Sequence, residues 1–251
     1  MVWALLGALL IGISLGLLGS GGSILTVPIL VYLVGEPEKV AIAESLGVVA
    51  AISLIGMVPY AIRNEVHWKS VFFFGIPAML GTYGGASISA FISGNTQLII
   101  FAVVMILAAG LMIKNGIEKD SNKELSVSKY VLLAEGLIVG VLTGLVGVGG
   151  GFLIIPALVL VAGLEMRIAI GTSLFIIAAK SALGFYKYLD VLRSESLDVN
   201  WELLGIFTVI GIIGSFVGGR VGRNVPQKAL KRGFGFFLIL MGFFILGSKL
   251  I

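Results

Sequence analysis

The chain has 251 residues, of which 58% are hydrophobic and only 12% are charged, whereas a typical soluble domain has about 25% charged residues. This composition excludes an ordinary soluble domain and predicts an all-α integral membrane protein. The net charge of +4 does not indicate nucleic acid as a partner, because membrane proteins collect Lys and Arg in their cytoplasmic segments. The sequence has no cysteine, which excludes disulfides and cysteine-based metal sites.

The first 34 residues are apolar for too long to form one crossing, and glycines interrupt them at residues 19–22. We expect two arms, 2–18 and 22–34, each shorter than the ~20 residues that cross a hydrocarbon core. Glycine at this density disfavours an unbroken helix. A re-entrant hairpin is one interpretation, and two tightly joined helices are the alternative.

Three transmembrane helices and then a hydrophilic linker complete the first half, at about 40–62, 70–92, 96–114 and 115–129. The second half repeats this order, with a broken element and three helices at about 130–162, 168–189, 203–222 and 232–250. We therefore predict two homologous repeats, 1–114 and 130–251. Each is a glycine-broken helical hairpin plus three transmembrane helices.

The two broken elements are copies of one motif. Residues 16–28, GLLGSGGSILTVP, correspond to residues 144–156, GLVGVGGGFLIIP, at an offset of 128. After a longer polar link in the second half the offset becomes 133, so that His67 corresponds to Asn200. Glycine-broken apolar segments in matching halves are the strongest sequence indication of a transporter's binding site.

The distribution of basic residues favours inverted repeats. In an inverted arrangement one face carries twelve Lys and Arg residues and the other carries four, whereas parallel repeats would give nine against seven. The positive-inside rule therefore places the linker 115–129 in the cytoplasm and both termini outside. The twelve residues of this basic face are Arg63, Lys69, Lys114, Lys119, Lys123, Lys129, Arg167, Arg220, Arg223, Lys228, Lys231 and Arg232.

The glycine breaks of inverted repeats approach each other near the membrane midplane. Helices that start there present backbone N–H groups and positive dipole ends, which bind anions. We therefore predict an anion-binding site made by Gly19, Ser20, Gly21, Gly22 and Ser23 of the first copy and Gly147, Gly149, Gly150 and Gly151 of the second. The alternative is that the glycines only allow helices to pack closely.

Lys180 lies about ten residues from either end of the predicted helix 169–189. A charge at this depth is costly and usually marks a functional site, so Lys180 is a candidate ligand of the anion. A structural ion pair with Glu44 or Glu135 is the alternative. Hydroxyl groups that complete the candidate site come from Ser45, Thr172 and Ser173. His67, the only histidine, is expected to be a solvated loop residue.

Enzyme signatures are missing from the sequence. No phosphate-binding or dinucleotide-binding glycine motif occurs in the required context, and one histidine without cysteine leaves no metal-ligand cluster. We therefore predict no catalytic residue, metal or cofactor. The lack of an ATP-binding motif indicates that transport uses a gradient, of a coupling ion or of the substrate itself.

The paired glycine motifs resemble the signature of the TauE/SafE sulfite exporter family, together with residues 43–46, AESL, and 171–174, GTSL, fifteen residues after each motif. The resemblance covers nearly the whole chain. It implies a multi-pass carrier in the bacterial inner membrane for a sulfur-containing anion, such as sulfite, a sulfonate, sulfoacetate or thiosulfate, that is often described as an exporter. A passive anion channel and, third, a membrane-embedded enzyme are the competing hypotheses.

Overall fold

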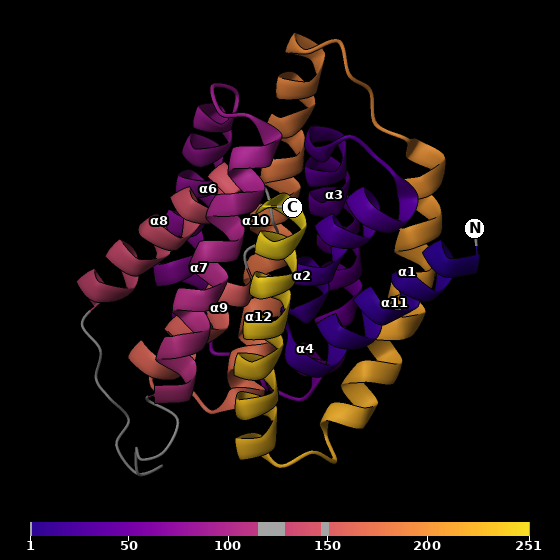
Figure 1. Ribbon diagram of the computed structural model, residues 1–251. Helices are drawn as coiled ribbons and strands as arrows, with labels where there is room; N and C mark the ends of the chain where they lie inside the picture. Colours follow the sequence, from indigo (N-terminus) through magenta and orange to yellow (C-terminus); the bar gives the residue numbers. More distant parts are fainter. Residues whose placement is uncertain (1, 115–128, 147–150, 251) are drawn as a thin grey trace.

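The computed structural model describes residues 2–114, 129–146 and 151–250 (Figure 1), and every regular element in these ranges is a helix. The segments η1, η2 and η3 are π-helical. The elements are α1 (Val2–Leu18), α2 (Gly21–Pro28), η1 (Ile29–Val34), α3 (Glu38–Gly56), α4 (Val58–Ile62), α5 (Trp68–Ser70), η2 (Val71–Gly75), α6 (Ile76–Ser89), α7 (Gly94–Lys114), α8 (Lys129–Val146), α9 (Gly151–Pro156), η3 (Ala157–Val161), α10 (Met166–Ser194), α11 (Trp201–Gly222) and α12 (Gln227–Leu250).

Six helices in the described ranges are long and apolar enough to cross a membrane, at Glu38–Ile62, Trp68–Ser89, Lys129–Val146, Met166–Ser194, Trp201–Gly222 and Lys228–Ser248. The prediction of an all-α membrane protein is thereby confirmed. α10 continues to Ser194, past the predicted end at residue 189. Large apolar side chains such as Leu80, Val209 and Phe243 are exposed, as expected where lipid instead of water covers the surface.

The first broken element is a hairpin with antiparallel arms. Gly19 has φ +70°, a left-handed conformation that glycine adopts without strain, and it separates α1 from α2. A Cβ atom on Gly22 would lie 2.6 Å from the Ile11 carbonyl oxygen, and one on Gly7 would lie 2.8 Å from Ile29. The break therefore falls where the glycines predict it, and the second arm returns along the first.

The first arm of each broken element packs against a helix of the other half, and the two contacts are equivalent in the repeat. α1 packs on α11, where a Cβ atom on Gly12 would overlap the Gly211 carbonyl group. α8 packs on α6, where one on Gly140 would overlap the Ala78 carbonyl group. Gly12 and Gly140 differ by the offset of 128, and Ala78 and Gly211 by 133. The small residues therefore let each half pack the first arm of its broken element against a helix of the other half.

The central helices α3 and α10 are equivalent in the repeat and run antiparallel. Lys39 forms an ion pair with Glu195 at one end, Gly47 faces Phe185 further along, and Tyr60 lies against Gly171 at the other end. In Figure 1, α3 descends to α4 at the lower end while α10 rises to the top, between the α6/α8 pair and the α1/α11 pair. Opposite directions for equivalent helices are what inverted repeats require.

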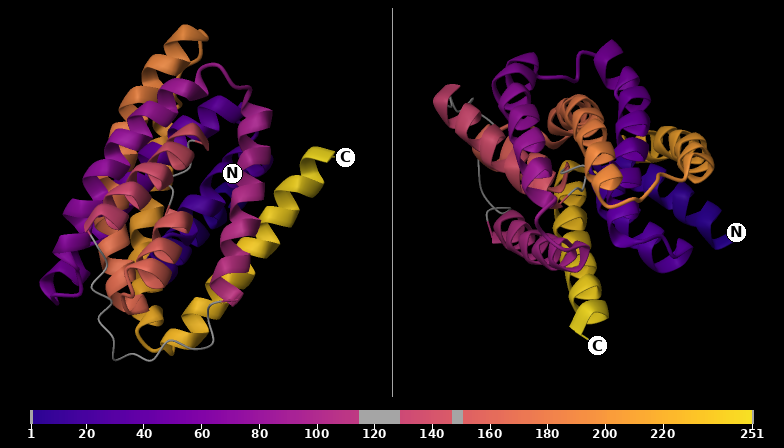
Figure 2. Two further views of the ribbon diagram at one scale, coloured as in Figure 1. Left: turned by 90° about the vertical axis from the view of Figure 1, so that its left-hand side faces the viewer. Right: turned by 90° about the horizontal axis from the view of Figure 1, so that it is seen from above.

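α7 and α12 close the two halves of the chain and pack side by side. Figure 2 shows them together along one side of the bundle. Gly242 of α12 lies close to Ile106 of α7, because a Cβ atom there would be 2.6 Å from the Ile106 side chain. The pair also contacts the second arms of the broken elements, α12 against α2 and α7 against α9.

Candidate functional site

The two broken elements meet at the starts of their second arms. A Cβ atom on Gly151, at the beginning of α9, would overlap the Cβ atom of Ser20, which precedes α2. The same atom would lie 2.5 Å from Cδ1 of Ile177, near the middle of α10. The predicted site residues Ser20 and Gly151 therefore contact each other, and they lie beside the central helix α10. Gly147, Gly149 and Gly150 lie outside the described residues.

Hydrogen bonds fix the first break in place. The single Ser173 hydroxyl hydrogen is shared between the carbonyl oxygens of Gly19 at 3.2 Å and Ile170 at 2.9 Å. Ser23 Oγ donates to the carbonyl oxygen of Ser20 at 2.7 Å. The predicted residues Ser173 and Ser23 therefore hold the backbone of the break, and both side chains are buried.

Ser20 differs from these serines because its buried hydroxyl has no hydrogen-bond partner in the described part of the chain. An unpaired buried polar group costs roughly 1–3 kcal/mol. Ser53 and Ser181 share this property, and they occupy equivalent positions on the antiparallel helices α3 and α10. Among the described residues, these three serine hydroxyls are therefore groups that a polar ligand or water would satisfy.

Lys180 is buried and donates from Nζ to Thr143 Oγ1 of α8 at 2.6 Å. None of the ion pairs among the described residues includes Lys180. The alternative interpretation, a structural pair with Glu44 or Glu135, is therefore not what the structure shows. Lys180 lies three residues after Ile177, about 4.5 Å along the helix axis, so it is close to the contact between the breaks.

Glu44 and Thr172 each accept a hydrogen bond from the backbone of the other half of the chain. Glu44 Oε1 accepts a hydrogen bond from the backbone N–H of Asn200 at 2.8 Å, and Thr172 Oγ1 accepts one from that of His67 at 2.9 Å. Glu44 corresponds to Thr172, and His67 to Asn200, in the repeat. Thr172 is therefore placed at the polar link, where its hydroxyl anchors the chain before α5.

His67 is half-buried and belongs to this link, which differs from the solvated loop residue that we expected. Its Nδ1 accepts a hydrogen bond from the backbone N–H of Ser70 at 3.3 Å, and its ring lies 2.8 Å from Ser70 Oγ. His67 thus caps α5. Ser45, one residue after Glu44, is buried on α3.

Two tyrosines that sequence reasoning missed secure the first arms. Tyr60 donates from its hydroxyl to the Gly16 carbonyl oxygen at 3.2 Å, and Tyr188 donates to the Gly144 carbonyl oxygen at 3.2 Å. Both pairs obey the offset of 128. The last carbonyl groups of a helix lack partners within it, so these hydroxyls stabilise the arm ends just before the breaks. The sequence did contain a signal for them, because Tyr60 and Tyr188 are separated by the same 128 residues as the two motifs.

The surroundings of the two tyrosines differ. Gln97 donates from Nε2 to the Tyr188 hydroxyl at 3.0 Å and to the Leu145 carbonyl oxygen at 2.6 Å, which seals that arm end. The position equivalent to Gln97 in the second half is Leu230.

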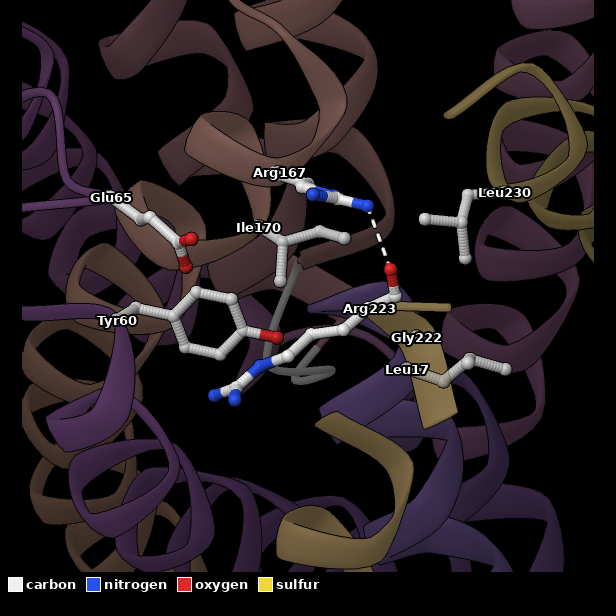
Figure 3. A pocket seen from close by; sticks show the side chains of 8 residues that line it. All are labelled: Leu17, Tyr60, Glu65, Arg167, Ile170, Gly222, Arg223 and Leu230. Carbon is white, nitrogen blue, oxygen red and sulfur yellow. Dashed lines mark hydrogen bonds between the residues drawn. The ribbon is translucent and has the colours of Figure 1, made fainter. Parts of the chain in front are cut away.

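Tyr60 lies instead beside a cavity of about 260 Å³, lined by Gly56, Pro59, Tyr60, Arg63, Ser215, Phe216, Gly219, Arg220 and Arg223. A smaller pocket adjoins it (Figure 3) and shares Tyr60 and Arg223. In this pocket Arg167 donates to the Arg223 carbonyl oxygen at 2.7 Å. The surroundings of Tyr60 are therefore open and basic, whereas those of Tyr188 are sealed.

Comparison with known proteins agrees with this architecture. The family model of the sulfite exporter TauE/SafE matches residues 4–245. The chain belongs to the TauE/SafE family. A "Probable membrane transporter protein" of Xylella fastidiosa (strain 9a5c) is 31% identical over 94% of this chain and 91% of its own length. The similarly named YunE of Bacillus subtilis is 30% identical over 84% and 83%. No solved structure matches the chain.

Membership of the TauE/SafE family and the names of these relatives indicate a membrane transporter rather than an enzyme. A probable membrane transporter protein of Methanocaldococcus jannaschii is 29% identical over 95% of this chain and 94% of its own length. The six spanning helices make this TauE/SafE protein a multi-pass membrane protein, for which the plasma membrane is the usual place.

Proposed function

We propose that the protein is a secondary transporter that exports a small sulfur-containing anion, such as sulfite, a sulfonate, sulfoacetate or thiosulfate. The observation that carries this proposal is the buried Ser20 hydroxyl at the start of α2, which has no hydrogen-bond partner among the described residues and lies where the two broken elements meet. The start of a helix attracts negative charge through its N–H groups and its dipole. A bound oxyanion would accept a hydrogen bond from Ser20 at this point.

Lys180 supports an anionic substrate. Its buried ammonium group has three donor hydrogens, and within the described residues it donates to the uncharged Thr143 hydroxyl. A buried charge needs compensation, which an anion would provide. Ser53 and Ser181 offer further hydroxyls from α3 and α10. We propose that these side chains contribute to one polar site that binds an anion of a few atoms.

The packing of the two halves supports a carrier mechanism. The equivalent helices α3 and α10 run antiparallel, and each half packs against the other through equivalent contacts. Transporters with inverted repeats alternate access by moving one repeat or helix bundle against the other. In this conformation the Tyr60 side adjoins a cavity, while Gln97 seals the Tyr188 side. We propose that the reverse arrangement, closed at Tyr60 and open at Tyr188, is the second state of the transport cycle.

Flux in proteoliposomes tests the proposal. Purified protein would be reconstituted and supplied with labelled sulfite, thiosulfate or sulfoacetate, with chloride as the comparison anion. A carrier gives saturable flux, and unlabelled anion on the far side accelerates the exchange. Flux that rises linearly with concentration and shows no exchange indicates a channel, and chemical conversion of the anion indicates an enzyme. Either result contradicts the proposal.

A further inference from the structure

Three arginines converge on the cavity beside Tyr60. Arg63 follows α4 in the first half of the chain, whereas Arg220 and Arg223 are at the end of α11 in the second half. None of the three takes part in an ion pair within the ranges that the structure describes. The cavity therefore carries positive charge that no carboxylate neutralises at close range.

The positive-inside rule explains why arginines occur on this face, but it does not explain why they gather around one cavity. The equivalent positions in the other half are Val191, Ser87 and Ala90. The arginines are therefore not a by-product of the repeat. They distinguish the cavity beside Tyr60 from the sealed region beside Tyr188.

Only a thin layer of side chains separates this cavity from the first glycine break. Tyr60 lines the cavity and hydrogen-bonds to Gly16, three residues before Gly19. In the adjoining pocket, Figure 3 shows the Arg223 side chain running past the hydroxyl end of Tyr60, with Ile170 close by. Ile170 in turn contacts the break, because a Cβ atom on Gly19 would lie 2.9 Å from its Cγ2 atom.

We infer that the cavity is a capture site for the transported oxyanion, in which Arg63, Arg220 and Arg223 bind the anion before it passes Tyr60 to reach the breaks. This inference rests on the proposed function. Guanidinium groups bind oxyanions through paired, charge-assisted hydrogen bonds. The volume of about 260 Å³ is below the range of roughly 300–1,000 Å³ for drug-sized ligands, which suits a small hydrated anion.

Charge in a confined cavity also raises the local concentration of an opposite ion and speeds its capture. The arginines should therefore act most strongly when substrate is scarce and ionic strength is low.

The test uses inverted membrane vesicles, in which the cytoplasmic face points outward, and thiosulfate as the probe. In the double variant Arg63→Gln/Arg220→Gln we expect the concentration that gives half-maximal uptake to rise about tenfold, with the maximal rate kept. The rise should shrink at high salt. Arg232→Gln removes one charge from the same basic face but outside the cavity lining, and it should change the half-maximal concentration less than twofold. Equal half-maximal concentrations in wild type and double variant would overturn the capture site while leaving transport intact.

Direct binding separates this inference from the proposed function and from a lipid occupant, since a headgroup phosphate offers the same chemistry. Thiosulfate would be titrated into full-length protein in phosphatidylcholine nanodiscs. Binding that the double variant loses would support the capture site even if no flux were found. Thermal stabilisation by added phosphatidylglycerol but not by thiosulfate, lost in the double variant, would assign the cavity to lipid and overturn the inference.

Discussion

Ser20 and Gly151 lie against each other where the two halves of the chain meet, and Gly151 has no room for a Cβ atom. One residue comes from each broken element, so this contact joins the two copies of the motif. It also brings the unpartnered Ser20 hydroxyl next to the central helix α10. Gly151 therefore lets the two breaks pack closely, and it thereby positions the Ser20 hydroxyl, the candidate group that binds the anion.

Gly151→Ala should strongly reduce transport because the added methyl group pushes the two breaks apart. Ile177 Cδ1 is the end of a flexible side chain and can move, but the Ser20 Cβ atom is fixed to the backbone of the break. Flux in proteoliposomes measures the effect. Gly84→Ala is the matched control, because a Cβ atom there meets nothing within 4 Å. Equal flux in the two variants would contradict a functional contact.

The inverted arrangement predicts opposite sides for two positions in the chain. Asn122, in the linker that lies outside the described residues, should face the cytoplasm, and Ser248 near the end of α12 should face outward. Because the natural chain has no cysteine, Asn122→Cys and Ser248→Cys each create one labelling site. Membrane-impermeant thiol reagents applied to whole cells should label only the Ser248→Cys protein. Labelling of both would rule out inverted repeats.

Tyr188→Phe should lower the stability of the folded protein more than Tyr60→Phe does. The Tyr188 hydroxyl bonds to Gly144, Leu145 and Gln97 in a sealed region, and leaving those buried groups unpaired costs roughly 1–3 kcal/mol. Water from the cavity can replace the Tyr60 hydroxyl, so Tyr60→Phe should cost less than about 1 kcal/mol. Thermal unfolding in detergent compares the two. A larger loss for Tyr60→Phe would show that the Tyr188 side is not the sealed one.

Lys180→Met should weaken anion binding about ten- to a hundred-fold while the protein still expresses, because it removes a charged donor worth roughly 1.5–3 kcal/mol. The structure shows a Thr143 hydroxyl, not a carboxylate, beside Lys180, so the substitution leaves no buried negative charge behind. Lys187→Met on the same helix is the control, since Lys187 pairs with Asp190 at 3.6 Å nearer the helix end. A well-folded Lys180→Met protein with unchanged affinity would remove Lys180 from the site.

The helices and the breaks were predictable because each depends on local sequence. The length of the apolar runs predicted five of the six spans; the sixth, Lys129–Val146, was expected as an arm of the second broken element, and the predicted helix 96–114 contributes a shorter apolar stretch, Gly94–Gly110. The glycine cluster at residues 19–22 located the first break within a residue of Gly19. The same glycines, read as a repeat, pointed to the contact between Ser20 and Gly151. Local patterns were sufficient because backbone conformation and hydrophobicity are properties of short segments.

Contacts between distant residues were not predictable in this way. Glu44 was considered as a partner of Lys180, but its carboxyl group instead caps a backbone N–H at Asn200, 156 residues away. The Tyr60 and Tyr188 hydroxyls act on carbonyl groups 44 residues earlier. The basic cavity exists only because the ends of α4 and α11 converge. Such pairings depend on how helices pack, which charge and spacing along one chain do not specify.

The most direct test of the central claim is the affinity of Ser20→Ala for the sulfur anion that the wild-type protein transports fastest. Titration calorimetry on the full-length protein would measure it, with Ser14→Ala as the control, because the Ser14 hydroxyl is already bonded to the Ile11 carbonyl oxygen within α1. If the anion binds where the breaks meet, Ser20→Ala should bind it about tenfold more weakly and Ser14→Ala as tightly as the wild type. Equal affinity in all three proteins would contradict a binding site at the contact between Ser20 and Gly151.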